Sequence, residues 1–239
     1  MLTLILIVAV IFFANFAQSV AGFGLAMIAM PLLIALHVPL FVAAPLVALV
    51  NLLARIIQIV HYRRDIHLSD VWPLMLAAAL GIPVGVFVLQ DFDPTVISRL
   101  LGLIVLGYAG MQIFNFYIPA MSHSLWAYGM GFASGLLGGA YNIGGPPVII
   151  YATGRKWPTI IFKANIQVMA FSNAVLIIAA QSAKGNVDEN VLLIFLISIP
   201  LILIGLVLGF LLEPHISQDH FRRIVLGLLV LLGLRLLLG

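Results

Sequence analysis

The sequence contains no cysteine, and only 8% of its 239 residues are charged. The missing cysteines exclude disulfide bonds, thiolate nucleophiles and cysteine-ligated metal sites. Soluble domains carry roughly 25% charged residues, whereas 64% of this chain is hydrophobic. A soluble globular domain is therefore excluded. The net charge of +3 is also too small to indicate nucleic acid binding.

Acidic residues are missing from the middle of every long apolar segment. All eight lie in or beside the short polar breaks between segments, although proton relays and cation pathways in membranes depend on buried carboxylates. The six histidines lie near the same breaks and lack metal-ligand spacing. No nucleophile elbow, P-loop, HExxH motif or dinucleotide fingerprint occurs. The sequence therefore predicts that the protein is not an enzyme and uses no cofactor or metal.

Eight apolar segments make up most of the chain. Apolar runs of about 20 residues are typical of membrane-spanning helices, whereas a barrel would alternate over segments of about 10. The first 20 residues lack the basic region of a signal peptide and are interpreted as part of the fold. We expect an all-α polytopic membrane protein with one membrane transport domain, residues 1–239. The segments are 1–36, 40–60, 71–90, 96–118, 124–153, 159–183, 190–212 and 222–238.

Two of these segments are broken by glycine and proline. The first reads FAQSVAGFGLAMIAMPLLI (16–34) and the second FASGLLGGAYNIGGPPVII (132–150). In a register of 116 residues, Pro31 aligns with Pro147. The chain is therefore predicted to be a duplication with one interrupted segment in each half. In a membrane protein, such a pair of segments points to a transport site at the repeat interface.

A second internal similarity supports the duplication. The glycines Gly81 and Gly85 recur 124 residues later in the chain. We therefore expect two repeats, residues 1–120 and 121–239, and in each repeat a broken segment is followed by three ordinary helices.

The positions of the basic residues predict the topology. If all eight segments crossed the membrane, basic clusters would lie on both faces, against the positive-inside rule. If segment 124–153 is re-entrant, most basic residues share the cytoplasmic face. By repeat similarity, segment 1–36 is re-entrant as well, although a complete crossing is left open. Each half then has three transmembrane helices, the repeats are inverted, and both termini lie outside. The residues assigned to the cytoplasmic face are Arg63, Arg64, Arg155, Lys156, Arg222 and Arg223.

The broken segments are the candidate anion site. Non-helical backbone survives at membrane depth only where it is buried in protein or lines a wet cavity. Half-helices that begin near Leu25 and Gly145 would point their N-termini, with free N–H groups and about half a positive charge, at the membrane centre. Two such ends facing each other would bind an anion without a basic side chain. The predicted substrate-binding residues are Gln18, Ser19, Gly22, Phe23, Gly24, Gly138, Gly139, Tyr141, Asn142, Gly144 and Gly145.

Simpler explanations remain open for these residues. The glycines would also allow close helix packing, because small residues let helix backbones approach each other in membranes. Ser19 or Ser134 could hydrogen-bond a carbonyl of its own helix. Asn142 lies inside a glycine loop and is the polar residue that we favour most.

Polar residues also interrupt two of the ordinary helices. Arg55 and Lys163 are expected about one turn from the cytoplasmic end, where they would either gather anions in a basic vestibule or act as snorkelling anchors. Asn51 and Gln167 could instead be interhelical hydrogen-bond partners. The predicted vestibule or gating residues are Arg55, Lys163, Gln167, Pro31 and Pro147.

The paired motifs AGFGLAMIAMPLL and GLLGGAYNIGGPPVIIY resemble the TauE/SafE family of sulfite exporters, also named DUF81. The likeness runs from about residue 5 to residue 235. It implies two repeated halves and a location in the bacterial inner membrane. It also implies transport of small organosulfur or sulfur-oxyanions of the sulfite, sulfonate or sulfoacetate type.

Three functional hypotheses follow from the residues and the resemblance together. The first is an exporter that works by alternating access between inverted repeats. The second is an anion channel that uses the same helix-end site, and the third is a membrane component that binds a partner and moves nothing. The expected partners are a small anionic substrate and the lipid bilayer. A homodimer is also compatible with the glycine-rich helices.

Overall fold

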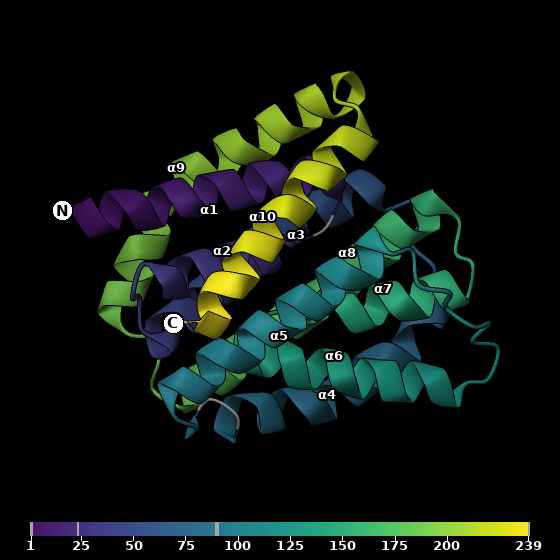
Figure 1. The fold of residues 1–239 in the computed structure, drawn as a ribbon, viewed down its shortest axis with the longest axis horizontal. Helices are drawn as coiled ribbons and strands as arrows, with labels where there is room; N and C mark the ends of the chain where they lie inside the picture. Colours follow the sequence, from purple (N-terminus) through teal and green to yellow (C-terminus); the bar gives the residue numbers. More distant parts are fainter. Residues whose placement is uncertain (1, 23, 89–90, 239) are drawn as a thin grey trace. The chain divides into compact units, whose positions relative to one another are not determined.

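The computed structural model describes residues 2–22, 24–88 and 91–238, and Figure 1 shows these residues as helices joined by short connections. No strand occurs within these ranges. Phe23, one of the predicted site residues, lies outside them. The helices are α1 Leu2–Ala21, α2 Leu25–Ala35, α3 Leu40–Tyr62, α4 Leu68–Phe87, α5 Pro94–Ile113, α6 Leu125–Tyr141, α7 Gly145–Gly154, α8 Thr159–Ala183, α9 Glu189–Leu212, the 3-10 turn η2 Glu213–His215 and α10 Gln218–Leu238.

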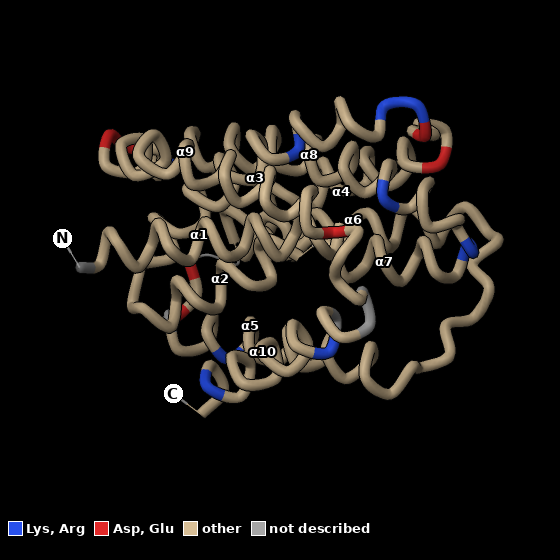
Figure 2. The backbone as a smooth tube through the Cα atoms, turned by 90° about the horizontal axis from the view of Figure 1, so that it is seen from above, with Lys and Arg blue, Asp and Glu red and all other residues tan. Residues whose placement is uncertain are grey.

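Six helices in the described part of the chain are long and apolar enough to cross a membrane: α1, α3, α4, α5, α8 and α9. Lys, Arg, Asp and Glu gather mostly at helix ends and connections, which leaves long uncharged stretches between them (Figure 2). The prediction of an all-α polytopic membrane protein is confirmed. Whether the broken segments are re-entrant stays a prediction.

Both predicted breaks are present, and each has left-handed backbone. At the first break, Gly22 has φ 79° and Gly24 has φ 104°, values that glycine adopts without steric cost. At the second break, Asn142 has φ 58° and ends α6. The two half-helices begin at Leu25 and Gly145, as the sequence predicts.

The spacing of the breaks differs from the sequence register. Gly145 begins α7 120 residues after Leu25 begins α2, four residues more than the register of 116. Pro31 therefore lies inside α2, whereas Pro147 lies in the first turn of α7. The two prolines that the sequence register aligns thus have different structural positions.

The chain forms two compact units, and each takes helices from both sequence halves. Unit 1 comprises Met1–Val50, Phe92–Phe116 and Val187–Gly239, and unit 2 comprises Asn51–Asp91 and Tyr117–Asn186. The long helix α3 is shared, because the division falls after Val50.

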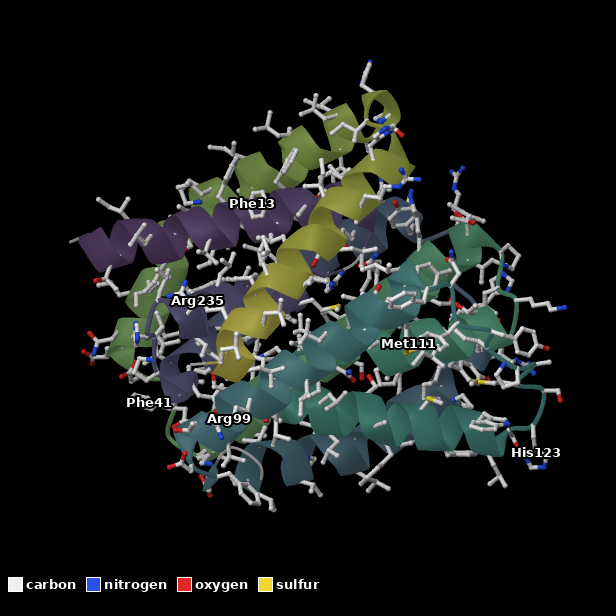
Figure 3. The ribbon with its side chains drawn as sticks, viewed as in Figure 1. Phe13, Phe41, Arg99, Met111, His123 and Arg235 are labelled. Carbon is white, nitrogen blue, oxygen red and sulfur yellow. The ribbon has the colours of Figure 1, made fainter. Side chains whose placement is uncertain are left out.

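In unit 1, α1 packs along α9, and α5 packs along α10 (Figure 1). A Cβ atom on Gly209 of α9 would lie 2.2 Å from the Cβ of Ser19 on α1. At the other contact, a Cβ on Gly102 of α5 would lie 2.8 Å from the carbonyl oxygen of Gly233 on α10. Glycine is therefore what lets these backbones approach each other. Arg235 of α10 donates from Nη2 to the carbonyl oxygen of Ala35 at the end of α2, 3.1 Å away (Figure 3).

In unit 2, α4 and α6 run side by side in the same direction (Figure 1). Along this seam, Gly131 faces Leu74, Gly135 faces Ala78 and Gly139 faces Ile82, and each glycine meets backbone atoms of its partner. The three glycines recur every fourth residue, so they form one stripe on α6. Helix α8 also packs against α4.

Candidate functional site

The break between α6 and α7 is tied to α8 by two consecutive hydrogen bonds. Asn173 on α8 donates from Nδ2 to the Oγ of Ser134 on α6, 3.3 Å away. Ser134 in turn donates from Oγ to the carbonyl oxygen of Gly144, 2.7 Å away. Ser134 and Asn173 are buried. Ser134 therefore bonds the far side of the break, and not a carbonyl of its own helix.

The glycines around this break face two different neighbours. A Cβ on Gly139 would lie 2.3 Å from the carbonyl oxygen of Ile82, so Gly139 serves helix packing. A Cβ on Gly144 would lie 3.0 Å from Nδ2 of Asn173, and a Cβ on Gly138 would lie 3.6 Å from the same atom. Gly138 and Gly144 thus border the Asn173 amide, which lies at the break itself.

The N-terminus of α7 has few backbone N–H groups that could bind an anion. Gly145 is the first residue of α7, and Pro146 and Pro147 follow it. Proline has no backbone N–H, so two of the first three donors are missing. The corresponding start of α2 in unit 1, from Leu25 to Met27, contains no proline. The two helix starts are therefore chemically unequal.

A buried arginine lies in the part of α3 that belongs to unit 2. Arg55 is only 5% exposed, although it lies within a candidate membrane span. Its Nη1 donates to Oε1 of Gln58, 2.9 Å away, and to Oε1 of Gln167 on α8. This burial does not fit the interpretation of Arg55 as a snorkelling anchor, because an anchor keeps its charge in water. Gln167 is an interhelical hydrogen-bond partner, one of the two roles left open for it.

Further polar residues of unit 2 lie near this pair along α8. Asn165 is buried, and its Oδ1 accepts a hydrogen bond of 2.8 Å from the backbone N–H of His67, before α4. Lys163 is partly exposed, and Asn51 is buried on α3. The N-terminal half of α8 thus places two amides, Asn165 and Gln167, in the interior of unit 2.

Unit 1 buries three polar residues on α1, shortly before its break. Gln18 and Ser19 belong to the predicted site, whereas Asn15 does not, and all three are at most 2% exposed. Asn15 donates from Nδ2 to the carbonyl oxygen of Ile11 on its own helix, 2.8 Å away. Ser19 lies against Gly209 of α9. The spacing of four residues between Asn15 and Ser19, which puts both on one helix face, is the signal that could have found Asn15.

Comparison with known proteins identifies the family. The family model for the sulfite exporter TauE/SafE matches residues 7–236. The chain belongs to the TauE/SafE family. It is also 31% identical over 238 residues to a probable sulfite/organosulfonate exporter TauE from Cupriavidus necator, an alignment that covers 94% of this chain and 90% of the relative. No solved structure matches the chain significantly.

Membership of TauE/SafE determines the general class of activity. The proteins of this family are exporters, so this chain is a multi-pass membrane transporter and not an enzyme. Within the described ranges, no three His, Asp or Glu side chains gather closely enough to hold a metal ion.

The structure of this TauE/SafE chain shows which of the predicted site residues lie near one another. The structure brings Gly138 and Gly144 together with Asn173, a residue absent from the predicted substrate-binding set. It also joins Arg55 to Gln167, which were both predicted as vestibule residues. The signal for Asn173 was its polar side chain inside the apolar segment 159–183. Only packing distinguishes it from the other amides of α8.

Proposed function

We propose that this chain exports small sulfur oxyanions or organosulfonates, of the sulfite, sulfonate or sulfoacetate type, across the bacterial inner membrane. The name of the Cupriavidus necator relative, a probable sulfite/organosulfonate exporter, supports this substrate class. The observation that carries the anion specificity is the buried Arg55 in unit 2.

A buried arginine within a candidate membrane span favours an anionic substrate. Desolvating a guanidinium costs free energy that hydrogen bonds and opposite charge must offset. Oε1 of Gln58 and Oε1 of Gln167 accept hydrogen bonds from it and hold the guanidinium in place. Ionisable residues inside membranes mark substrate pathways, and the planar guanidinium matches the oxygens of an oxyanion. Arg55 would then act as the charged group that receives the substrate, with Lys163 attracting anions nearer the surface.

Each unit also has one broken segment, and each broken segment would supply further anion contacts within its own unit. In unit 1, the proline-free start of α2 would give N–H donors, with Gln18, Ser19, Gly22 and Gly24 beside the break. In unit 2, the start of α7 would contribute its helix dipole, and Asn142, Tyr141 and the bordering glycines would contribute shape and polar groups.

The proposed transport mechanism is alternating access by a carrier with inverted repeats. A matching pair of contacts supports the repeats. Gly81 and Gly85 of α4 meet α6, and the glycines that follow them by 124 residues on α9 meet α1. Because each compact unit contains helices of both halves, we propose that the units move as bodies, and not the sequence halves. We propose that both termini lie outside, which follows from the positive-inside rule if both broken segments are re-entrant.

Export of an anion needs no coupling ion in this scheme. An inside-negative potential contributes roughly 2.3 kcal/mol per charge per 100 mV in the outward direction. The sequence has no carboxylate in the middle of an apolar segment to carry a coupled proton. We therefore expect uniport driven by the concentration gradient and the membrane potential.

The function is tested with purified protein in liposomes loaded with sulfite. We expect sulfite release to saturate, to show counterflow and to accelerate when the loaded side is negative. Release that does not respond to the membrane potential would contradict uniport. Linear, channel-like rates without counterflow would contradict the carrier, and no release of any sulfur oxyanion would contradict the function itself.

The role of Arg55 is tested by substitution in the same assay. Arg55→Gln should lower transport at least about tenfold, the equivalent of one charge-assisted hydrogen bond. The matched control is Arg99→Gln, which removes the same charge from an exposed position on α5. Arg55→Lys keeps the charge but loses the planar guanidinium, so its transport rate should lie between those of Arg55→Gln and Arg99→Gln. Equal rates for Arg55→Gln and Arg99→Gln would remove Arg55 from the site.

A further inference from the structure

The Asn173 amide, at the break between α6 and α7, has a buried atom without a hydrogen-bond partner among the described residues, Oδ1. Asn173 is 6% exposed. The hydroxyl of Tyr141, the last residue of α6, is also buried without such a partner. Buried polar groups are almost always paired, so an unpaired acceptor at a candidate binding site points to a ligand that supplies the missing donor.

The single hydroxyl proton of Ser134 determines which atom of the Asn173 amide is unpaired. The Ser134 hydroxyl has one proton, and the 2.7 Å contact to the Gly144 carbonyl oxygen uses it, because a carbonyl can only accept. Towards Asn173, Ser134 can therefore only accept a hydrogen bond. The amide atom 3.3 Å from Ser134 must then be the donor Nδ2. The other amide atom, Oδ1, is an acceptor.

The neighbouring residues position the Asn173 amide, and with it Oδ1, at the break. The amide lies beside Gly138 of the last turn of α6 and beside Gly144, which caps the start of α7. Any side chain at position 144 would meet Nδ2 at 3.0 Å. The hydrogen bond to Ser134 further restrains the amide. The nearby start of α7 carries a partial positive charge. The anionic end of a ligand would therefore lie near the start of α7, and a donor group elsewhere on the ligand would lie near Oδ1 of Asn173.

We propose that the unit 2 site selects anions that also carry a hydrogen-bond donor, and that Oδ1 of Asn173 accepts that donor. Hydrogen sulfite and sulfonates with a hydroxyl group fit this description, whereas a plain alkanesulfonate does not. The inference rests on the proposed function and narrows its substrate class. An anion without a donor would leave Oδ1 unpaired and would bind more weakly.

A matched pair of ligands tests this selectivity. Ethanesulfonate and 2-hydroxyethanesulfonate have the same charge and differ by one hydroxyl group. Binding of each to the purified full-length protein in detergent is measured by calorimetry. We expect the hydroxylated ligand to bind at least about tenfold more tightly, as sites built to pair a hydroxyl reject the analogue without it.

Substitution of Asn173 links this preference to one atom. Asn173→Leu keeps the approximate size of the side chain without the acceptor, and should reduce the affinity ratio of the two ligands to about one. The ratio is informative even if the substitution weakens the protein, because a general loss of structure lowers both affinities. The control is Gln181→Leu on the same helix, which removes another buried amide with an unpaired atom away from the break and should leave the ratio unchanged.

The outcomes separate this inference from the proposed function. Equal affinity of the two sulfonates for the unmodified protein would overturn the inference, because Oδ1 would then be paired by water alone, and would leave the exporter proposal intact. The same holds if Asn173→Leu keeps the full preference. Binding of neither sulfonate, nor of sulfite, would contradict the proposed function instead.

Discussion

The backbones of Gly135 on α6 and Ala78 on α4 are in direct contact, since a Cβ on Gly135 would lie 2.2 Å from the carbonyl oxygen of Ala78. We predict that Gly135→Ala forces the two helices apart and destabilises the protein by about 1–3 kcal/mol, as overpacking does. Gly129 is the matched control on the same helix, because a Cβ there has no neighbour within 4 Å. Thermal unfolding in detergent measures both. Similar stability of the two variants would refute the close α4–α6 contact.

The contact between α1 and α9 can be captured by a disulfide, because the chain has no native cysteine. A Cβ on Gly205 would lie 3.4 Å from the Cβ of Asn15, close to the separation that a disulfide requires. We predict that the double variant Asn15→Cys/Gly205→Cys cross-links under oxidation. A protease site is placed between residues 114 and 124. After cleavage, the two fragments should migrate as one band on a denaturing gel until the disulfide is reduced. Asn15→Cys/Leu203→Cys, which uses an exposed position on α9, should not cross-link.

The same cross-link tests which bodies move during transport. Both cysteines lie in unit 1, although they come from different sequence halves. If the compact units are the moving bodies, the cross-linked protein should keep transporting sulfite in liposomes. A transport rate that collapses on oxidation and returns on reduction would instead indicate that the sequence halves move against each other.

A test of Asn142 requires a substitution that can adopt the same left-handed backbone conformation. Its φ of 58° lies in the left-handed region, where a bulky apolar residue is strained. Such a residue would disturb the fold as well as any binding site. Asn142→Gly keeps the left-handed conformation and removes only the amide, so we predict unchanged thermal stability and reduced transport. Unchanged transport by a stable Asn142→Gly variant would exclude Asn142 from the site.

Asp93 caps the start of α5 and gives the stability a dependence on pH. Hydrogen bonds from the backbone N–H of Thr95, foremost, and of Val96 lower the pKa of Asp93. A lowered pKa means that the ionised cap stabilises the protein above the ordinary aspartate pKa of about 3.9, and that this stabilisation disappears as the pH falls through the folded-state value. We predict that Asp93→Ala lowers the unfolding temperature at pH 7, and that its difference from the unmodified protein shrinks in acid.

The control for Asp93 separates capping from titration. Asparagine caps helices about as well as aspartate but does not titrate. Asp93→Asn should therefore stay close to the unmodified protein at pH 7 and show none of the acid-dependent loss. If Asp93→Ala keeps a constant deficit at every pH, the titration of Asp93 is not its cause.

Much of the helical framework was readable from the sequence, because apolar runs and helix breakers act locally. The starts of the half-helices at Leu25 and Gly145 follow from glycines directly before them. The alignment of the two repeats was harder to predict than the helix starts. Proline tolerates both the first turn of a helix and, with neighbouring support, a membrane helix interior. Aligning Pro31 with Pro147 therefore gave a spacing four residues shorter than that of the breaks.

The sequence by itself determined the all-helical membrane character, the two broken segments and the family, since composition and local motifs are enough for each. Only the tertiary structure decided which residues meet. It joined Arg55 to Gln167, 112 residues later, and set Asn173 against the break at Gly144. It also built each compact unit from both sequence halves. In membranes every segment is apolar, so hydrophobicity does not choose the partners of a helix. Close backbone packing at glycines and the pairing of buried polar groups make that choice.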